Sequence, residues 1–139
     1  MIYLSTGGFQ KLTPQSVIKK YDKIGVKSIE LSGGKYVQSQ KIIKFLKEKH
    51  NINFALHNYF PVPKKKFVIN LGSFEKKIFK KTFLNIKKSI DISSKLKSKY
   101  FGFHAGFLFD PNIKDLGKKF TDVRLQDRKK TINLFLARV

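Results

Sequence analysis

The stretch Tyr100-Phe-Gly-Phe-His104-Ala-Gly106-Phe107 indicates how this chain folds. Its first four residues resemble a buried strand, and a histidine, a small residue and a glycine follow at its carboxyl end. An earlier stretch, Ile52-Asn-Phe-Ala-Leu-His57-Asn-Tyr59, has the same form. Together they predict two strands that place His57 and His104 on the same rim of one sheet.

Apolar runs and amphipathic segments alternate along the whole chain. We expect strands at residues 2–5, 27–31, 52–57 and 99–104, and helices at about 14–24, 36–49, 74–96 and from 121 or 122 towards the terminus. In the third helix, the helical spacing predicts a buried stripe formed by Phe79, Phe83, Ile86 and Ile90. Strands that alternate with helices are typical of βαβ units, so we expect an α/β fold with parallel strands in a single domain over residues 1–139.

The composition limits the classes of protein to consider. There is no cysteine among the 139 residues, which excludes disulfides and thiolate metal sites. The start lacks the pattern of a signal peptide, and no stretch approaches the roughly 18–20 apolar residues of a membrane span. We therefore expect a cytoplasmic protein without a membrane partner.

The net charge of +21 allows two interpretations. One is a polyanionic partner such as nucleic acid. The other is a compositional bias, which the lysine-rich, arginine-poor sequence favours, since phosphate and base readers usually rely on arginine. The aromatic residues lie mostly at core spacing rather than among basic residues, which argues against a stacking platform for bases.

Two histidines and one glutamate are the candidate catalytic residues. At the ends of adjacent parallel strands, His57 and His104 would stand about 5 Å apart, where they could bind one metal ion or contact one substrate. Glu30 lies in an apolar strand, where a carboxylate is costly unless it is paired or functional, so it is a candidate base, metal ligand or substrate contact. The alternatives are satisfied polar residues at the core edge and a lysine partner for Glu30.

Three further residues are candidates for substrate binding. Asn58, Tyr59 and Asn70 follow the third predicted strand, and their side chains suit hydrogen bonds to a sugar hydroxyl or a phosphate. Ordinary turn chemistry is the alternative.

The order of these motifs resembles the xylose-isomerase-like TIM barrels. The resemblance rests on Leu56-His57-Asn-Tyr59, on Val68-Ile-Asn70-Leu-Gly-Ser73 before a long helix, and on Tyr100-Phe-Gly-Phe-His104-Ala-Gly106. Ser5-Thr-Gly-Gly and Ile29-Glu30-Leu-Ser are similar to the family's first two strands. This superfamily comprises sugar phosphate isomerases and epimerases and the related class II AP endonucleases.

The resemblance implies an eight-stranded barrel with a divalent metal ion (Zn, Mn or Mg) at its carboxyl face. It also implies proton transfer between adjacent carbons of a sugar, a sugar phosphate or another hydroxy-carbonyl compound, or phosphodiester cleavage in the endonuclease branch. His57 and His104 match histidines that contact the metal or the substrate there. The family's other ligands come from later strands.

The chain departs from this family in length. A (β/α)₈ barrel needs about 250 residues, whereas this chain offers about four βα units, the N-terminal half of such a barrel. A truncated reading frame, a homodimer that completes the barrel and a decayed remnant each explain this. The end at Leu134-Phe-Leu-Ala-Arg-Val139 favours truncation, because it falls inside a helical pattern without a cap. We then expect the metal not to be bound by this chain alone. A nucleic-acid-binding protein and a non-catalytic, self-associating half-barrel are the alternative functions.

Overall fold

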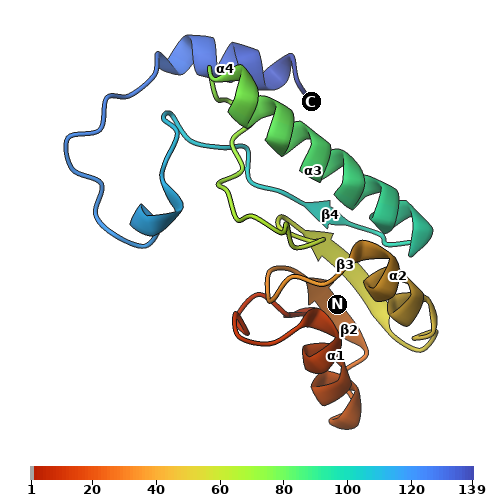
Figure 1. Ribbon diagram of the computed structural model, residues 1–139. Helices are drawn as coiled ribbons and strands as arrows, with labels where there is room; N and C mark the ends of the chain where they lie inside the picture. The colour runs from red at the N-terminus through yellow and green to blue at the C-terminus, as the bar shows by residue number, and fades with distance from the viewer. Residues whose placement is uncertain (1) are drawn as a thin grey trace. The chain divides into compact units, whose positions relative to one another are not determined.

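A four-stranded parallel sheet alternates with helices in the computed structural model, which describes residues 2–139 (Figure 1). The strands are β1 (Leu4–Ser5), β2 (Ser28–Leu31), β3 (Asn53–His57) and β4 (Phe101–Gly102). The helices are α1 (Pro14–Lys23), α2 (Ser39–Lys47), α3 (Lys76–Lys95) and α4 (Arg128–Leu136), with a 3₁₀ turn at Ile113–Asp115. The predicted α/β architecture with a parallel sheet is confirmed.

The strand order is the order of the chain, β1-β2-β3-β4, and each neighbouring pair is parallel. Because such crossovers are right-handed, a sheet that grows in one direction carries its helices on one face. The core shows that face: Ile29 and Leu31 lie in register with Phe54 and Leu56, and all four are buried. They form one cluster with Ile18 of α1, Ile42 and Leu46 of α2, and Ile92 of α3.

The opposite face of the sheet is polar. Side chains alternate along a strand, so the neighbours of the apolar residues point the other way. These neighbours include Ser5, Glu30, Ala55, His57 and Gly102, which are linked by the registers Ser5–Glu30, Glu30–Ala55 and His57–Gly102. The helices therefore cover an apolar face and leave a face with ionisable groups.

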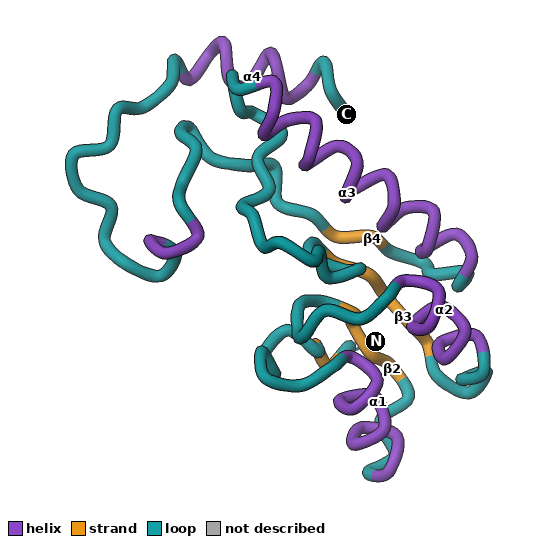
Figure 2. Tube along the Cα trace, viewed as in Figure 1, coloured by secondary structure: helices purple, strands orange, loops and turns teal. Residues whose placement is uncertain are grey.

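The chain divides into two compact units. The first comprises residues 2–64 and 85–103 and holds the whole sheet, and the second comprises residues 65–84 and 104–139. Much of the second unit is loop (Figure 2). Across residues 2–139, no helix is both long and apolar enough to pass through a bilayer.

Helix α1 shows why local signals place an element correctly. The Thr13 hydroxyl accepts a hydrogen bond from the Ser16 N–H at 3.3 Å, Pro14 occupies the first turn, and Gly25 follows the end with a φ of 81°.

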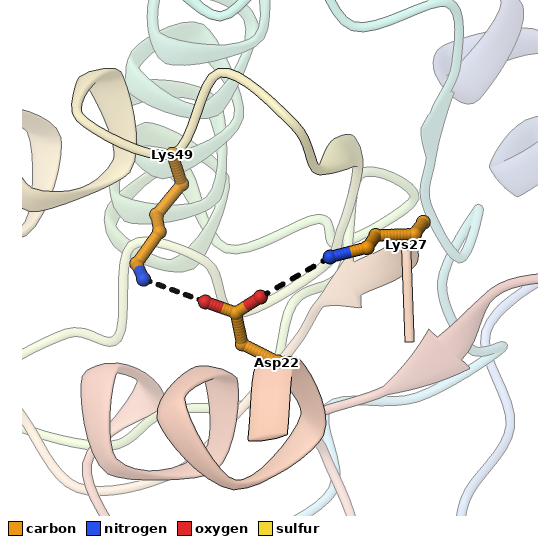
Figure 3. A network of polar contacts seen from close by, with 3 residues as sticks. All are labelled: Asp22, Lys27 and Lys49. Atoms are coloured by element: carbon orange, nitrogen blue, oxygen red, sulfur yellow. Dashed lines mark hydrogen bonds and ion pairs between the residues drawn. The ribbon is translucent and has the colours of Figure 1, made fainter. Parts of the chain in front are cut away.

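Asp22, near the end of α1, forms ion pairs with Lys49 at 2.7 Å and Lys27 at 3.5 Å (Figure 3). The hydrogen bond from Lys49 is the main reason that the pKa of Asp22 is lowered.

The predicted buried stripe of α3 is wrong. Phe83 is 44% exposed and Ile90 is 50% exposed. The buried face is instead largely one of hydroxyl groups, namely Thr82, Ser89 and Ser93, with Ile92. Hydrogen bonds explain the choice: in the second unit the Thr82 hydroxyl accepts from the Asn70 N–H at 3.1 Å, and in the first unit the Ser89 hydroxyl donates to the Phe60 carbonyl at 2.5 Å.

Helix α4 starts later than predicted. It begins at Arg128 instead of residue 121 or 122, because the Asp127 carboxylate caps it by accepting from the Lys130 N–H at 2.7 Å. Strand β4 is also shorter than the predicted 99–104 and ends at Gly102.

Candidate functional site

The carboxyl edge of the sheet is fixed by a buried threonine. Thr6 follows β1, and its hydroxyl donates to the Ser32 carbonyl at 2.6 Å and accepts from the Ser32 N–H at 2.9 Å. Both bonds join the end of β1 to the end of β2. Because they hold the backbone of Ser32 on both sides, they fix the position from which its side chain projects.

His57 ends β3 beside Ser32. The Ser32 Oγ lies 3.5 Å from the His57 Nδ1, and also 3.5 Å from the Asn58 carbonyl oxygen. On the other side His57 lies in register with Gly102 of β4. A Cβ built on Gly102 would stand 3.1 Å from Cδ2 of His57, so the absence of a side chain at Gly102 leaves room for the imidazole.

Glu30 projects from the same face of the sheet as His57. It lies in register with Ala55, two residues before His57 on the neighbouring strand. From the strand spacing and the rise per residue, the two backbones are about 8 Å apart, within reach of two long side chains. The two ion pairs seen between lysines and carboxylates in residues 2–139 belong to Asp22, and neither involves Glu30.

Asn58 and Tyr59 directly follow His57, and each has one energetically unfavourable feature. Asn58 is only 2% exposed, and within residues 2–139 its side-chain oxygen is buried without a hydrogen-bond partner. Tyr59 adopts a φ of 64°, in the left-handed region that side chains disfavour. Each feature costs about 1–3 kcal/mol, and such costs concentrate at binding sites. Both residues therefore remain candidates for substrate binding.

Asn70 lies in the second unit, where its side-chain amide forms hydrogen bonds with other residues of the chain. Its Nδ2 donates to the Phe109 carbonyl at 2.9 Å and to the Asp110 carboxylate at 2.8 Å. Its Oδ1 accepts from the N–H groups of Gly72 and Phe107, both at 3.1 Å. These four bonds fill the side chain's capacity and give Asn70 a structural task. Its role in substrate binding stays a prediction.

His104 does not occupy the position equivalent to His57. The residue in register with His57 is Gly102, and β4 ends there. His104 is exposed and belongs to the second unit. The expected side-by-side register of the two histidines is therefore wrong, whereas their joint catalytic and metal-binding role stays a prediction.

The described residues do not form a complete metal site. Among residues 2–139 no group of three or more His, Asp or Glu side chains is arranged to hold an ion. At the carboxyl edge the ionisable donors are Glu30 and His57, whereas catalytic metal ions usually take three protein ligands. The divalent metal ion implied by the resemblance does not fit these two donors alone.

Three members of the site, Thr6, Ser32 and Gly102, were not among the site residues predicted from the sequence. The signal for Thr6 was its place directly after an apolar run, the same place that Ser32 has after the next run. The signal for Gly102 was a glycine within a strand, which often marks a close approach.

The carboxyl edge thus brings together a carboxylate, an imidazole, a serine hydroxyl and a buried amide oxygen. These groups suit hydrogen bonds to hydroxyl groups, and the carboxylate and imidazole suit proton transfer. Comparison of the chain with protein-family models, with curated proteins and with solved structures found no match.

Proposed function

We propose that the carboxyl edge of the sheet binds a small hydroxy-carbonyl compound of the sugar or sugar phosphate class. Glu30 and His57 then move a proton between the carbonyl carbon and the hydroxyl-bearing carbon next to it. One removes the proton from the carbon that carries the hydroxyl, and the other transfers a proton between the two oxygens of the resulting enediol. Return of the proton to the neighbouring carbon completes an isomerisation without any other reactant.

The observation that carries this proposal is the shared face of Glu30 and His57. Both project from the uncovered face near the carboxyl ends of parallel strands, the end at which α/β barrels and open sheets bind ligands. Ser32 Oγ lies 3.5 Å from the His57 Nδ1, so the imidazole is positioned beside a hydroxyl group at this edge.

The fold supports the same proposal. A sheet in the order β1-β2-β3-β4 matches four consecutive βα units of a TIM barrel, and we propose that this chain is half of a xylose-isomerase-like barrel. In that arrangement the face with Glu30 and His57 is the barrel interior. Further donors from another half would be needed before a metal ion could take part.

Deuterium exchange tests the proposal directly. The protein is incubated in D₂O with xylose, fructose 6-phosphate or dihydroxyacetone phosphate, and proton NMR follows the signal of the C–H next to the carbonyl. We expect the wild type to exchange this proton, and Glu30→Gln and His57→Gln to lose the exchange. Glu48→Gln and His50→Gln are matched controls, because both residues are exposed and away from this edge. Exchange at the wild-type rate in Glu30→Gln, or none in the wild type with all three compounds, would exclude the proposal.

A further inference from the structure

A hollow of about 370 Å³ lies in the first unit, at the amino ends of β3 and β4. One wall follows the end of α2 and the other follows the end of α3. It is lined by six basic residues: Lys47, Lys49, His50, Lys95, Lys97 and Lys99. No acidic residue of the described range 2–139 lines it. This hollow is at the opposite edge of the sheet from His57.

Helix ends and one ion pair explain some of these lysines. Lys47 and Lys95 lie in the last turns of α2 and α3, where a positive charge complements the helix dipole. Lys49 pairs with Asp22 at 2.7 Å (Figure 3). Lys97 and Lys99 follow the helix end, and within residues 2–139 neither has a carboxylate partner. They add positive charge that the fold does not need.

The backbone at Lys97 adds to this argument. Lys97 has a φ of 52° and ends α3 in the left-handed conformation that usually belongs to glycine. Its N–H donates to the Ser94 carbonyl at 3.0 Å, as in a helix stop. A lysine there is strained by comparison with glycine, and strain of this kind concentrates at binding sites.

Two tyrosines beside the lysines indicate which kind of anion the hollow binds. Tyr3 lines the hollow, and its ring meets the ring of Tyr100 edge to face, with centroids 6.0 Å apart. Tyr100 follows Lys99 directly and is 58% exposed. Exposed aromatic rings beside lysines are the pattern of proteins that hold single strands, in which bases stack while phosphates meet positive charge. We propose that this hollow binds single-stranded nucleic acid.

The volume of the hollow supports the same partner. About 370 Å³ lies at the lower end of small-molecule sites, which span about 300–1,000 Å³. A concave site of this size admits a nucleotide, whereas a flat anionic bilayer would meet only its rim.

Fluorescence anisotropy with a labelled oligothymidylate of about eight nucleotides tests the proposal, since single-strand sites cover about 4–16 nucleotides. We compare the wild type with Lys97→Gln/Lys99→Gln and with a control, Lys118→Gln/Lys119→Gln, which removes the same charge from an exposed loop. The first variant is expected to weaken binding about tenfold near physiological salt and to reduce the salt slope by about 1.4, because each phosphate contact on a single strand contributes about 0.7. The control is expected to change binding less than about twofold. Equal losses in the two variants, or no binding by the wild type, would overturn the proposal.

A second comparison separates a nucleic acid from other polyanions. Tyr100→Ala is expected to weaken oligothymidylate binding about tenfold, because one stacked base is lost, whereas Tyr36→Ala, another exposed tyrosine, leaves binding unchanged. Inorganic polyphosphate and vesicles rich in phosphatidylserine are then added as competitors at matched negative charge. If either displaces the oligonucleotide as well as unlabelled oligothymidylate does, and Tyr100→Ala has no effect, the hollow is a general anion site and the proposal fails. Circular dichroism of each variant confirms that its fold is retained.

Discussion

Asn70→Ala is expected to destabilise the second unit by about 3 kcal/mol. The substitution removes four hydrogen bonds, each of which contributes about 1 kcal/mol net. It also leaves the Gly72 N–H buried without its acceptor. Phe109 and Asp110 are only half-buried, so water can replace part of what their oxygens lose. That replacement sets the estimate below the full sum of about 4 kcal/mol.

Amide hydrogen exchange measured by NMR is the appropriate assay, because it reports each unit separately. The N–H groups of Gly72 and Phe107 donate to Asn70 directly, and both are expected to exchange about a hundredfold faster in Asn70→Ala. Amides of β3, which belong to the first unit, should change much less.

Asn85→Ala is the matched control for this experiment. Asn85 is also an asparagine with a buried amide, but within residues 2–139 its Nδ2 has no hydrogen-bond partner. Replacing it removes an unsatisfied group from a helix and introduces the best helix former, so we expect no loss of stability or a small gain. A cost below about 1 kcal/mol for Asn70→Ala, or equal costs for both variants, would refute the view that the Asn70 bonds hold this unit together.

Three further predictions concern other contacts. Arg138→Met is expected to lower the free energy of unfolding by about 2 kcal/mol. Its Nη1 donates to the Leu71 and Ser73 carbonyls at 2.6 and 2.8 Å, and its guanidinium lies 3.9 Å from the centroid of the Phe79 ring. Urea denaturation measures this loss, with the exposed Arg128→Met as the control. Since the pKa of Asp22 is lowered, chiefly by its hydrogen bond from Lys49, the stability it provides is present above its unfolded-state pKa of about 3.9 and is lost as the pH falls through the lower folded-state pKa. Thermal melts of Asp22→Asn should therefore fall below the wild type at neutral pH and converge with it in strong acid, and a constant difference across this range would contradict the assignment. Gly102→Ala is expected to displace the imidazole of His57, because the new Cβ would stand 3.1 Å from Cδ2; the ring signals of His57 should shift in NMR spectra while those of His50 stay in place.

The sequence was sufficient to predict the architecture because the relevant signals are local. Apolar runs and helix caps such as Thr13-Pro14 depend on neighbouring residues, and the alternation of the two element types specifies a parallel sheet. Strand register is not local. His57 and His104 each follow an apolar run, yet the chain pairs His57 with Gly102, and this offset of two residues depends on contacts between distant segments.

The buried face of α3 escaped prediction for a related reason. Periodicity favoured the apolar stripe that includes Phe83 and Ile90, since apolar residues usually face the core. Thr82 and Ser89 occupy the core side because each hydroxyl meets a backbone group supplied by a loop. Asn70 is similar, because its place in the sequence matched a binding motif. The bond from Gly72 is local turn chemistry, but the other three partners lie in residues 107–110, which no local pattern connects with Asn70.

The contact between Tyr3 and Tyr100 joins the two edges of the sheet. These residues precede β1 and β4, the first and last strands of the sheet, and strand spacing alone would separate their backbones by about 14 Å in a flat sheet. Their rings nevertheless meet edge to face, with centroids 6.0 Å apart. The two edge strands, which are not neighbours in the sheet, are therefore linked at its amino end by a contact between side chains.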